Sequence, residues 1–169
     1  MSKDVKKYSP PVRYVPFSLS KKDKEKQVRM LKTSRRLYKK GNYYTRGKVK
    51  SFRNKTSKHV LDARRIYGIE RVVPGVELSK KTGCSVDALN KIVNKGEGAY
   101  YSSGSRPNQT AQSWGIARLA SSITSGKSAA VDYDILDKGC DHNKKAFQLA
   151  KLSRKKYGFG HSKTKHLRV

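Results

Sequence analysis

Positive charge is spread so unevenly along this chain that only its middle has the composition of an ordinary globular domain. Residues 1–56 contain 19 Lys or Arg and 3 Asp or Glu, and residues 151–169 contain 7 Lys or Arg and no acid. Residues 57–150 contain 14 Lys or Arg and 9 Asp or Glu. The chain of 169 residues therefore has room for one domain with two basic extensions, which together carry most of the net charge of +28.

The basic extensions predict a negatively charged partner. Such segments repel themselves and need a polyanion or an acidic protein surface close by, and nucleic acid is the commonest polyanion. No apolar run approaches the roughly 18 residues that a membrane span needs, and the N-terminus lacks the apolar core of a signal peptide. With only Cys84 and Cys140 present, we expect no disulfide framework and a reducing compartment.

A structural hub is predicted in the run KGEGAYYSSGSRPNQTAQSWGIARL, from Lys95 to Leu119. Glycines beside aromatic rings favour backbone folded closely against ring faces. Thr110 is placed to cap a helix that starts near Ala111 and ends at Ser125-Gly126. Clusters of this kind are usually packing sites, so we interpret the run as a hub and not as an active site. Its expected members are Tyr100, Tyr101, Trp114 and Leu119.

Residues 1–19 are expected to form an extended basic arm, because three prolines interrupt them and they have no core of their own. Its aromatic side chains could anchor in a partner's pockets or stack on bases, and the alternative is a disordered solubilising tail. The candidate anchors are Tyr8, Tyr14 and Phe17.

A basic helix and a loop are predicted over residues 20–56. The helix starts at Ser20, with Asp23 in a short capping box, and ends at Gly41. Residues 42–56 then form a loop or short hairpin in which aromatic residues alternate with cations. That alternation suits a surface that tracks phosphates and stacks bases, although an exposed basic linker fits equally well. The candidate nucleic-acid contacts here are Arg46, Lys48 and Arg53.

A helical module is predicted over residues 57–152, starting with a helix that Ser57 caps and Gly68 closes. Within it, residues 75–94 resemble a helix-turn-helix motif, with Gly83 in the turn and Ser85 capping the second helix. The residues that would face a DNA groove are Ser85, Val86, Asp87, Asn90 and Lys91, of which Ser85, Asn90 and Lys91 are the candidate contacts. Asp87 argues against DNA reading, because a carboxylate there repels phosphates.

The rest of the module reads as further short elements followed by a tail. Residues 127–136 form a short helix or strand, and Asp132 and Asp134 are expected to bind the basic arms or neighbouring arginines. Asp141 should cap a last helix from His142 to Tyr157. Residues 153–169 form a basic tail. The expected fold class is mainly α: a small helical domain with a helix-turn-helix-like unit and extended basic N- and C-terminal arms.

Patterns that would indicate catalysis or a cofactor are incomplete. The SGKS run at residues 125–128 lacks the first glycine and the preceding strand of a P-loop. Cys140 and His142 could bind a metal, but a structural zinc site needs about four ligands. The carboxylates lack a partner base, nucleophile or oxyanion donor. We therefore expect no enzyme activity, no catalytic residues, no metal site and no cofactor.

The segment from about Tyr44 to Leu152 resembles an uncharacterised module that recurs in large nucleocytoplasmic DNA viruses of algae and protists. The resemblance is carried by KKTGCSVDALNKIVNKGEGAYYSSGSRPNQTAQSWGIARLASSIT, AAVDYDIL and GCDHNKKAFQLA, and GAYYSSGSRPNQT is its most distinctive part. The basic N-terminal arm and the first helix lie outside it. The resemblance implies a viral origin and a likeness to small basic virion proteins, including minor proteins of icosahedral capsids.

Two functions of different classes follow as expectations. In the first, the chain is a minor capsid protein of the virion, made in the host cell. It would cement the inner side of a large shell through its basic arms and contact the major and other minor capsid proteins. In the second, it is a non-enzymatic DNA-binding protein that compacts genomes or regulates genes.

Overall fold

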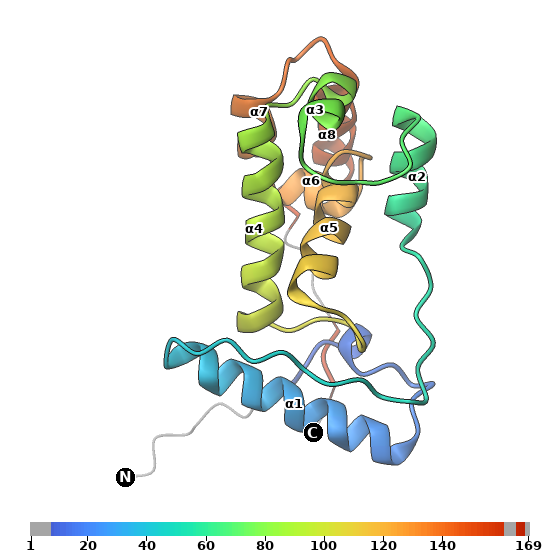
Figure 1. Cartoon of the computed structure of the whole chain (residues 1–169), viewed down its shortest axis with the longest axis vertical. Coiled ribbons are helices and arrows are strands. Elements are labelled where there is room, and N and C mark those ends of the chain that lie inside the picture. Colours follow the sequence, from blue (N-terminus) through green and yellow to red (C-terminus); the bar gives the residue numbers. More distant parts are fainter. Residues whose placement is uncertain (1–7, 161–164, 168–169) are drawn as a thin grey trace. The chain divides into compact units, whose positions relative to one another are not determined.

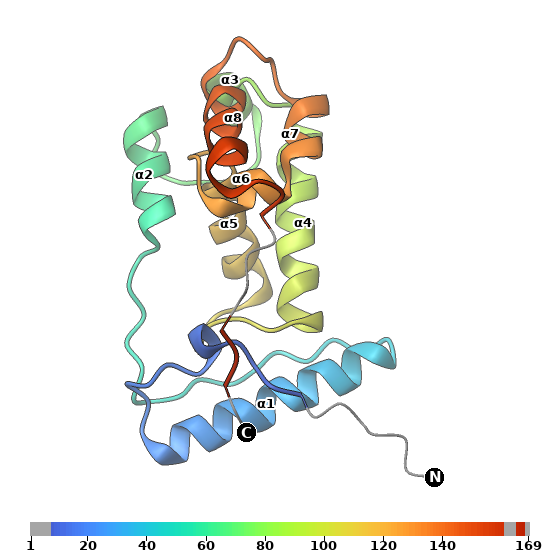
Figure 2. The ribbon, with the colours of Figure 1, turned by 180° about the vertical axis from the view of Figure 1, so that it is seen from behind.

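The computed structural model describes residues 8–160 and 165–167, and these residues are mainly helical. A short 3-10 helix, η1 (Val12–Tyr14), precedes the α-helices, and no strand occurs in the described ranges (Figures 1 and 2). The helices are α1 (Lys21–Lys39), α2 (Lys58–Tyr67), α3 (Val76–Thr82), α4 (Val86–Ser102), α5 (Ala111–Ser122), α6 (Lys127–Val131), α7 (Tyr133–Gly139) and α8 (Lys145–Tyr157).

The chain divides into two compact units. Unit 1 consists of residues 1–54, 101–110 and 163–169, and unit 2 consists of residues 55–100 and 111–162. The predicted hub run therefore does not stay in one unit: its middle belongs to unit 1, and its two ends belong to unit 2.

Unit 1 is built on the inner side of α1. Ser20 caps this helix by accepting a hydrogen bond from the backbone N–H of Asp23, at 3.2 Å, which confirms the predicted start. Its buried residues, spaced three or four apart, are Gln27, Met30, Leu31 and Ser34. Tyr14, Val15 and Leu19 are also buried in this unit. The expectation of an extended arm is therefore wrong for residues 8–19, because their apolar side chains have a core to enter.

The C-terminal segment is also anchored in unit 1. The N–H of Val12 donates to the carbonyl of Lys165 at 2.9 Å, and that of Leu167 donates to Pro10 at 2.9 Å. Ser9 adds a side-chain hydrogen bond to the carbonyl of Leu167. Residues 165–167 are thus paired with the N-terminal segment, whereas the sequence predicts a free basic tail. The rest of both predicted arms, residues 1–7, 161–164 and 168–169, lies outside the described residues.

Segment 101–110 organises the long loop of unit 1. Asn108 adopts a φ of 61° and binds that loop through its side chain. Its Oδ1 accepts from the N–H of Val49 at 2.7 Å, and its Nδ2 donates to the carbonyl of Phe52 at 3.0 Å. A Cβ on Gly104 would lie 2.7 Å from Leu31, so glycine permits a close approach to α1. The distinctive SGSRPN segment, residues 103–108, therefore has a structural role: it binds the long loop and packs closely against α1.

Unit 2 is a helical bundle whose core includes Leu78, Leu89, Ile92, Ile123 and Phe147. Helix α2 packs against α5 and α3, and α6 packs against α5, α7 and α8. Helices α4 and α5 run side by side in both opposite views (Figures 1 and 2). They approach closely because Gly96 and Gly115 meet: a Cβ on Gly96 would lie 2.6 Å from the Cα of Gly115.

Several helix boundaries in unit 2 follow the sequence, but α5 ends at Ser122 and not at the predicted Ser125-Gly126. Ser57 and Gly68 flank α2, and α5 begins at Ala111, as predicted. Residues 127–139 form two short helices, which differs from the single element predicted over 127–136. The last helix starts at Lys145 and not at His142, because the side chain of Asp141 accepts a hydrogen bond from the N–H of Asn143 in a local turn.

Candidate nucleic-acid interface

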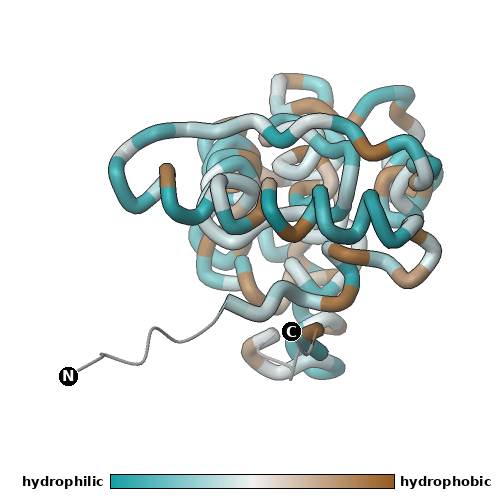
Figure 3. The backbone as a smooth tube through the Cα atoms, turned by 90° about the horizontal axis from the view of Figure 1, so that it is seen from below, coloured by the Kyte–Doolittle hydropathy of each residue, from teal (hydrophilic) through white to brown (hydrophobic). Residues whose placement is uncertain are grey.

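A row of cations occupies the outer side of α1. Most residues along this helix are hydrophilic (Figure 3). At 3.6 residues per turn, six exposed cations fall within an arc of about 100°, opposite the buried side chains. We call them the basic face: Lys21, Lys22, Arg29, Lys32, Arg36 and Lys39.

The basic face is not neutralised within the described part of unit 1. None of its six cations forms an ion pair with a carboxylate of the described residues. The two acids of α1 are Asp23 and Glu25. The Asp23 carboxylate accepts from the N–H of Ser51 at 2.8 Å, and exposed Glu25 lies within the arc of the basic face, where it lowers the net charge of the face without forming an ion pair to a described residue. From Lys21 to Lys39 the face extends about 27 Å at 1.5 Å per residue. One strand of duplex DNA carries about eight phosphates over that length.

The three contact residues predicted in the following loop have different surroundings. Lys48 and Arg53 are exposed. Arg46 is only 6 % exposed and donates hydrogen bonds to the hydroxyls of Ser34, at 2.9 Å, and Ser105, at 2.8 Å. The prediction that Arg46 contacts nucleic acid is therefore wrong, because its guanidinium is used inside unit 1.

The helix-turn-helix-like element of unit 2 has the local geometry that its sequence predicts. Helix α3 ends at Gly83, which has a φ of 81°. Ser85 caps α4 by accepting a hydrogen bond from the N–H of Ala88 at 3.1 Å. Asn90 and Lys91 are exposed on α4, and Lys91 pairs with Asp87 at 3.0 Å. One of the three candidate contacts is therefore engaged by a carboxylate.

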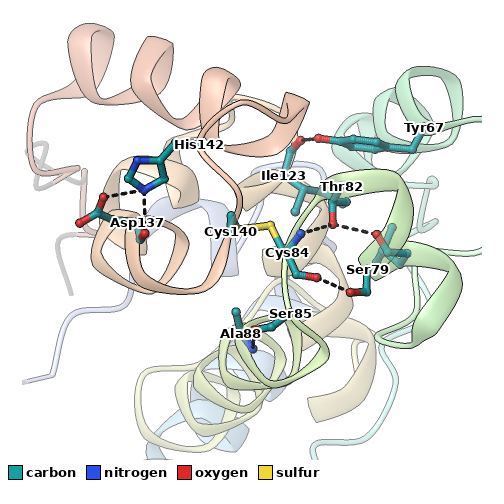
Figure 4. Close-up of a disulfide and its surroundings, with 11 residues drawn as sticks. Tyr67, Ser79, Thr82, Cys84, Ser85, Ala88, Ile123, Asp137, Cys140 and His142 are labelled. Carbon is teal, nitrogen blue, oxygen red and sulfur yellow. Dashed lines mark hydrogen bonds and ion pairs between the residues drawn. A yellow bond between two sulfur atoms is a disulfide. The ribbon is translucent and has the colours of Figure 1, made fainter.

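A disulfide joins the turn of this element to the end of α7, between Cys84 and Cys140 (Figure 4). The structure therefore contains a disulfide where the sequence predicts no disulfide framework. Two backbone hydrogen bonds flank the bridge, from the N–H of Ser85 to Gly139 at 2.7 Å and from that of Asp141 to Gly83 at 2.8 Å. Spacing alone could not reveal this pairing, because 56 positions separate the cysteines.

The segment after the disulfide lies against the turn. A Cβ on Gly83 would meet the Cβ of Lys144 at 2.4 Å, and a Cβ on Gly139 would meet that of Ala88 at 2.4 Å. In DNA-reading helix-turn-helix proteins, the N-terminal residues of the second helix contact base edges. Here the neighbouring chain segment occupies part of that region, so this geometry does not favour reading of a major groove by α4.

Of the predicted partner anchors, only Phe17 is available on the surface. Tyr14 is 4 % exposed and belongs to the core of unit 1. Tyr8 is half-buried, with the guanidinium of Arg35 4.2 Å from its ring centre, and burial raises the pKa of its hydroxyl. Phe17 is 75 % exposed. The prediction that Tyr14 anchors a partner is wrong, because a side chain packed in the core cannot enter a partner's pocket.

The hub residues also differ in burial. Tyr100 and Leu119 are fully buried in unit 2. Trp114, on α5, and Tyr101, in unit 1, are only partly buried. Trp114, a predicted hub member, is therefore not among the buried core residues of unit 2, which are mostly aliphatic and include Phe147.

Asp132, one of the two acids for which the sequence predicts a basic partner, forms a buried ion pair. Asp132 is 1 % exposed, and its carboxylate accepts hydrogen bonds from Arg118 Nε at 2.9 Å and Nη2 at 2.8 Å. This is the neighbouring-arginine contact predicted for Asp132, whereas Asp134 is exposed. Ser122 donates a further hydrogen bond at 3.1 Å. Each oxygen of the carboxylate is thus bound within the fold, which indicates a structural role.

The Cys-Asp-His run at 140–142 is also used structurally. Cys140 is disulfide-bonded, and His142 stacks on Phe147 with ring centres 3.9 Å apart. Within residues 8–160 and 165–167, no three His, Cys, Asp or Glu side chains gather where they could hold a metal. In the same ranges, each helix is too short or too polar to cross a membrane.

Comparison with known proteins gives one match. The model of a family of unknown function matches residues 11–146, which include α1 to α7 and the whole loop that follows α1 in unit 1. No curated protein and no solved structure matches the chain.

Proposed function

The chain belongs to the DUF5824 family, whose function is unknown, and we propose that it is a non-enzymatic protein that binds nucleic acid through the basic face of α1. The observation that carries the proposal is that all six cations of this face are exposed and lack carboxylate partners in the described residues. Phosphates would supply the missing countercharge and release the counterions that surround DNA.

Binding of nucleic acid through the basic face is expected not to depend on the nucleotide sequence. The outer side of α1 carries no exposed Asn or Gln, since its one amide side chain, Gln27, is buried and donates to the carbonyl of Tyr14 at 3.1 Å. Lysines and arginines spaced along a helix contact phosphates of any sequence. Compaction or coating of DNA fits this arrangement better than gene regulation through α4.

Fluorescence anisotropy with a labelled 20-base-pair duplex tests the proposal. Replacing Arg29, Lys32 and Arg36 together by Gln should weaken binding and lower the slope of log K against log salt by about 2.7, since each phosphate contact contributes about 0.9. The matched control replaces three exposed cations of unit 2, Lys80, Lys145 and Lys155, and should change the slope little. Equal losses in the two triple variants would contradict a role for α1.

The regulatory alternative gives a different result in the same assay. Under that reading, Asn90→Ala or Lys91→Ala would abolish preference for one duplex among competitors of equal length, and the α1 variant would keep it. We expect no such preference in the wild-type protein.

We propose the virion as the place where this binding occurs, with the chain a minor capsid protein on the inner side of a DNA-virus shell. The resemblance of residues 44–152 to a viral module supports this location, and an inner capsid surface faces packaged DNA. A specific observation favours a protein partner as well: Phe17 borders an apolar groove of about 380 Å³ in unit 1. The groove is lined by Val15, Phe17, Lys24, Glu25, Val28, Arg29 and Leu167.

Mass spectrometry of purified particles, with shell and genome fractions separated, tests the location. Phe17→Ala should then lower incorporation if this ring contacts the major or another minor capsid protein. Phe159→Ala is the matched control, because Phe159 is 73 % exposed and lies in unit 2. A protein found only with the genome fraction would support compaction and exclude the capsid location.

A further inference from the structure

Three tyrosine rings gather at one place in unit 1. The ring of Tyr43 lies 6.2 Å from that of Tyr38 and 5.0 Å from that of Tyr101, between ring centres. Tyr38 is in the last turn of α1, Tyr43 in the following loop and Tyr101 in the last turn of α4. We call these three residues the tyrosine cluster.

The tyrosine cluster is open to solvent and is not part of the core. Tyr43 is 71 % exposed and Tyr38 is 39 % exposed. Tyr14, a core tyrosine of the same unit, is by contrast only 4 % exposed. Exposed aromatic rings that contact one another mark binding surfaces more often than packing sites, because their apolar faces remain in water.

Cations flank Tyr38 and Tyr43 in the sequence, and this part of the sequence contains no acid, whereas Glu97 precedes Tyr101 by one turn of α4. Exposed Lys39 of the basic face follows Tyr38 in α1, and exposed Lys40 is the C-cap. No Asp or Glu occurs between Glu25 and Asp62, a stretch that includes most of α1 and the whole loop with Tyr43. The cluster therefore lies at the end of a positively charged helix.

We propose that the tyrosine cluster stacks on unpaired bases of a single-stranded nucleic acid whose phosphates are held by the exposed cations at the end of α1, Lys39 of the basic face and Lys40. This inference rests on the proposed function and adds the class of ligand. Every base offers a π face, so stacking on tyrosine tolerates any sequence. The ring of Tyr43 is tilted by 50° to that of Tyr38 and by 47° to that of Tyr101, so these rings do not stack face to face on one another.

Binding to three labelled probes separates stacking from charge. The probes are single-stranded dT20, a 20-residue abasic deoxyribose-phosphate strand and a 20-base-pair duplex. Tyr43→Ala should weaken binding of dT20 about 10-fold, as expected for the loss of one stacked base. It should leave binding of the abasic strand and the duplex within 2-fold of wild type, and the salt dependence for dT20 should not change, because no phosphate contact is lost.

Two matched variants control this experiment. Tyr43→Phe keeps the ring and should bind dT20 like wild type. Phe159→Ala removes an equally exposed aromatic ring of unit 2, 73 % against 71 %, and should have no effect on any probe. Thermal melting of each variant should match that of wild type, since the side chain of Tyr43 is mostly in solvent.

The outcomes distinguish this inference from the proposed function. If Tyr43→Ala binds dT20 as tightly as wild type, the stacking inference is wrong, and the basic face still accounts for duplex binding. If Tyr43→Ala weakens all three probes equally, the cluster acts through charge or folding, and the inference is again wrong. If the wild-type protein binds none of the probes at low salt, the proposed function fails together with it.

Discussion

Arg118 on α5 and Asp132 at the start of α7 form a two-pronged ion pair in unit 2, with nitrogen-to-oxygen distances of 2.9 and 2.8 Å. The side chain of Asp132 is fully buried and that of Arg118 is 21 % exposed. Lys95 of α4 approaches the same carboxylate at 3.4 Å. One carboxylate therefore links residues of α4, α5 and the α6–α7 junction.

Removing this carboxylate should strongly destabilise unit 2. Asp132→Ala leaves a mostly buried guanidinium without its countercharge, a loss that typically amounts to about 3–5 kcal/mol. Urea unfolding followed by circular dichroism measures it. Asp134→Ala is the control, because Asp134 is exposed and should cost less than about 0.5 kcal/mol. Similar losses in both variants would show that burial of the pair contributes little.

The contact between α4 and α5 predicts opposite effects for two glycines of the hub run. Gly115→Ala places a Cβ 2.6 Å from the carbonyl oxygen of Val93 and should destabilise by about 1–3 kcal/mol. A Cβ on Gly98, within α4, meets nothing within 4 Å. Gly98→Ala should therefore stabilise by up to about 1 kcal/mol, through helix propensity. Thermal melts of the two variants should shift in opposite directions.

The disulfide should contribute measurably to the stability of unit 2. Closing a loop of 56 positions restricts the unfolded chain and corresponds to about 4 kcal/mol in the chain-entropy model. Dithiothreitol should therefore lower the urea midpoint of the wild-type protein. The double variant Cys84→Ser, Cys140→Ser should start at the lower midpoint and not respond to dithiothreitol. Equal midpoints for wild type with and without reductant would exclude a stabilising role.

Variants of Arg46 and Lys48 should affect different properties: stability in the case of Arg46 and nucleic-acid binding in the case of Lys48. Arg46→Ala removes buried charge-assisted hydrogen bonds to Ser34 and Ser105 and should destabilise unit 1 by about 1.5–3 kcal/mol. Lys48→Ala should leave stability unchanged within about 0.5 kcal/mol, since Lys48 is exposed. It should reduce the salt dependence of DNA binding if its ammonium contacts phosphate. Chemical unfolding and anisotropy on both variants provide the comparison.

Acid should weaken unit 1 through Asp23. Hydrogen bonds from the side chain and backbone N–H of Ser51 lower the pKa of the Asp23 carboxyl below its ordinary value. Because the pKa of Asp23 is lower in the folded state than in the unfolded state, its carboxylate stabilises the fold at pH values above the pKa of the unfolded state, about 3.9. This stabilisation is lost as the pH falls through the pKa of the folded state. Melting temperatures between pH 2 and 5 should depend less on pH in Asp23→Asn than in Glu25→Gln, which leaves the contact with Ser51 intact.

The sequence determined the local structure of the chain, because the signals involved act over a few residues. Ser20, Ser57 and Ser85 each accept a hydrogen bond from the backbone at the start of a helix, and Gly68 and Gly83 end helices in the left-handed conformation. A cap involves atoms within one turn, so its residue type and position suffice to predict it. The mainly helical fold class followed from the same signals and from apolar spacing.

The tertiary structure alone decided which of several similar side chains lie inside. Arg46 and Arg53 occur in the same basic loop, but only Arg46 is buried, because Ser34 and Ser105 come from distant parts of the chain to accept its hydrogen bonds. Cys84 and Cys140 pair for the same reason: the α3–α4 turn and the end of α7 meet only in the folded unit. The tyrosine cluster likewise joins three separate segments. Such contacts depend on how helices pack against one another, and no spacing within the sequence specifies that packing.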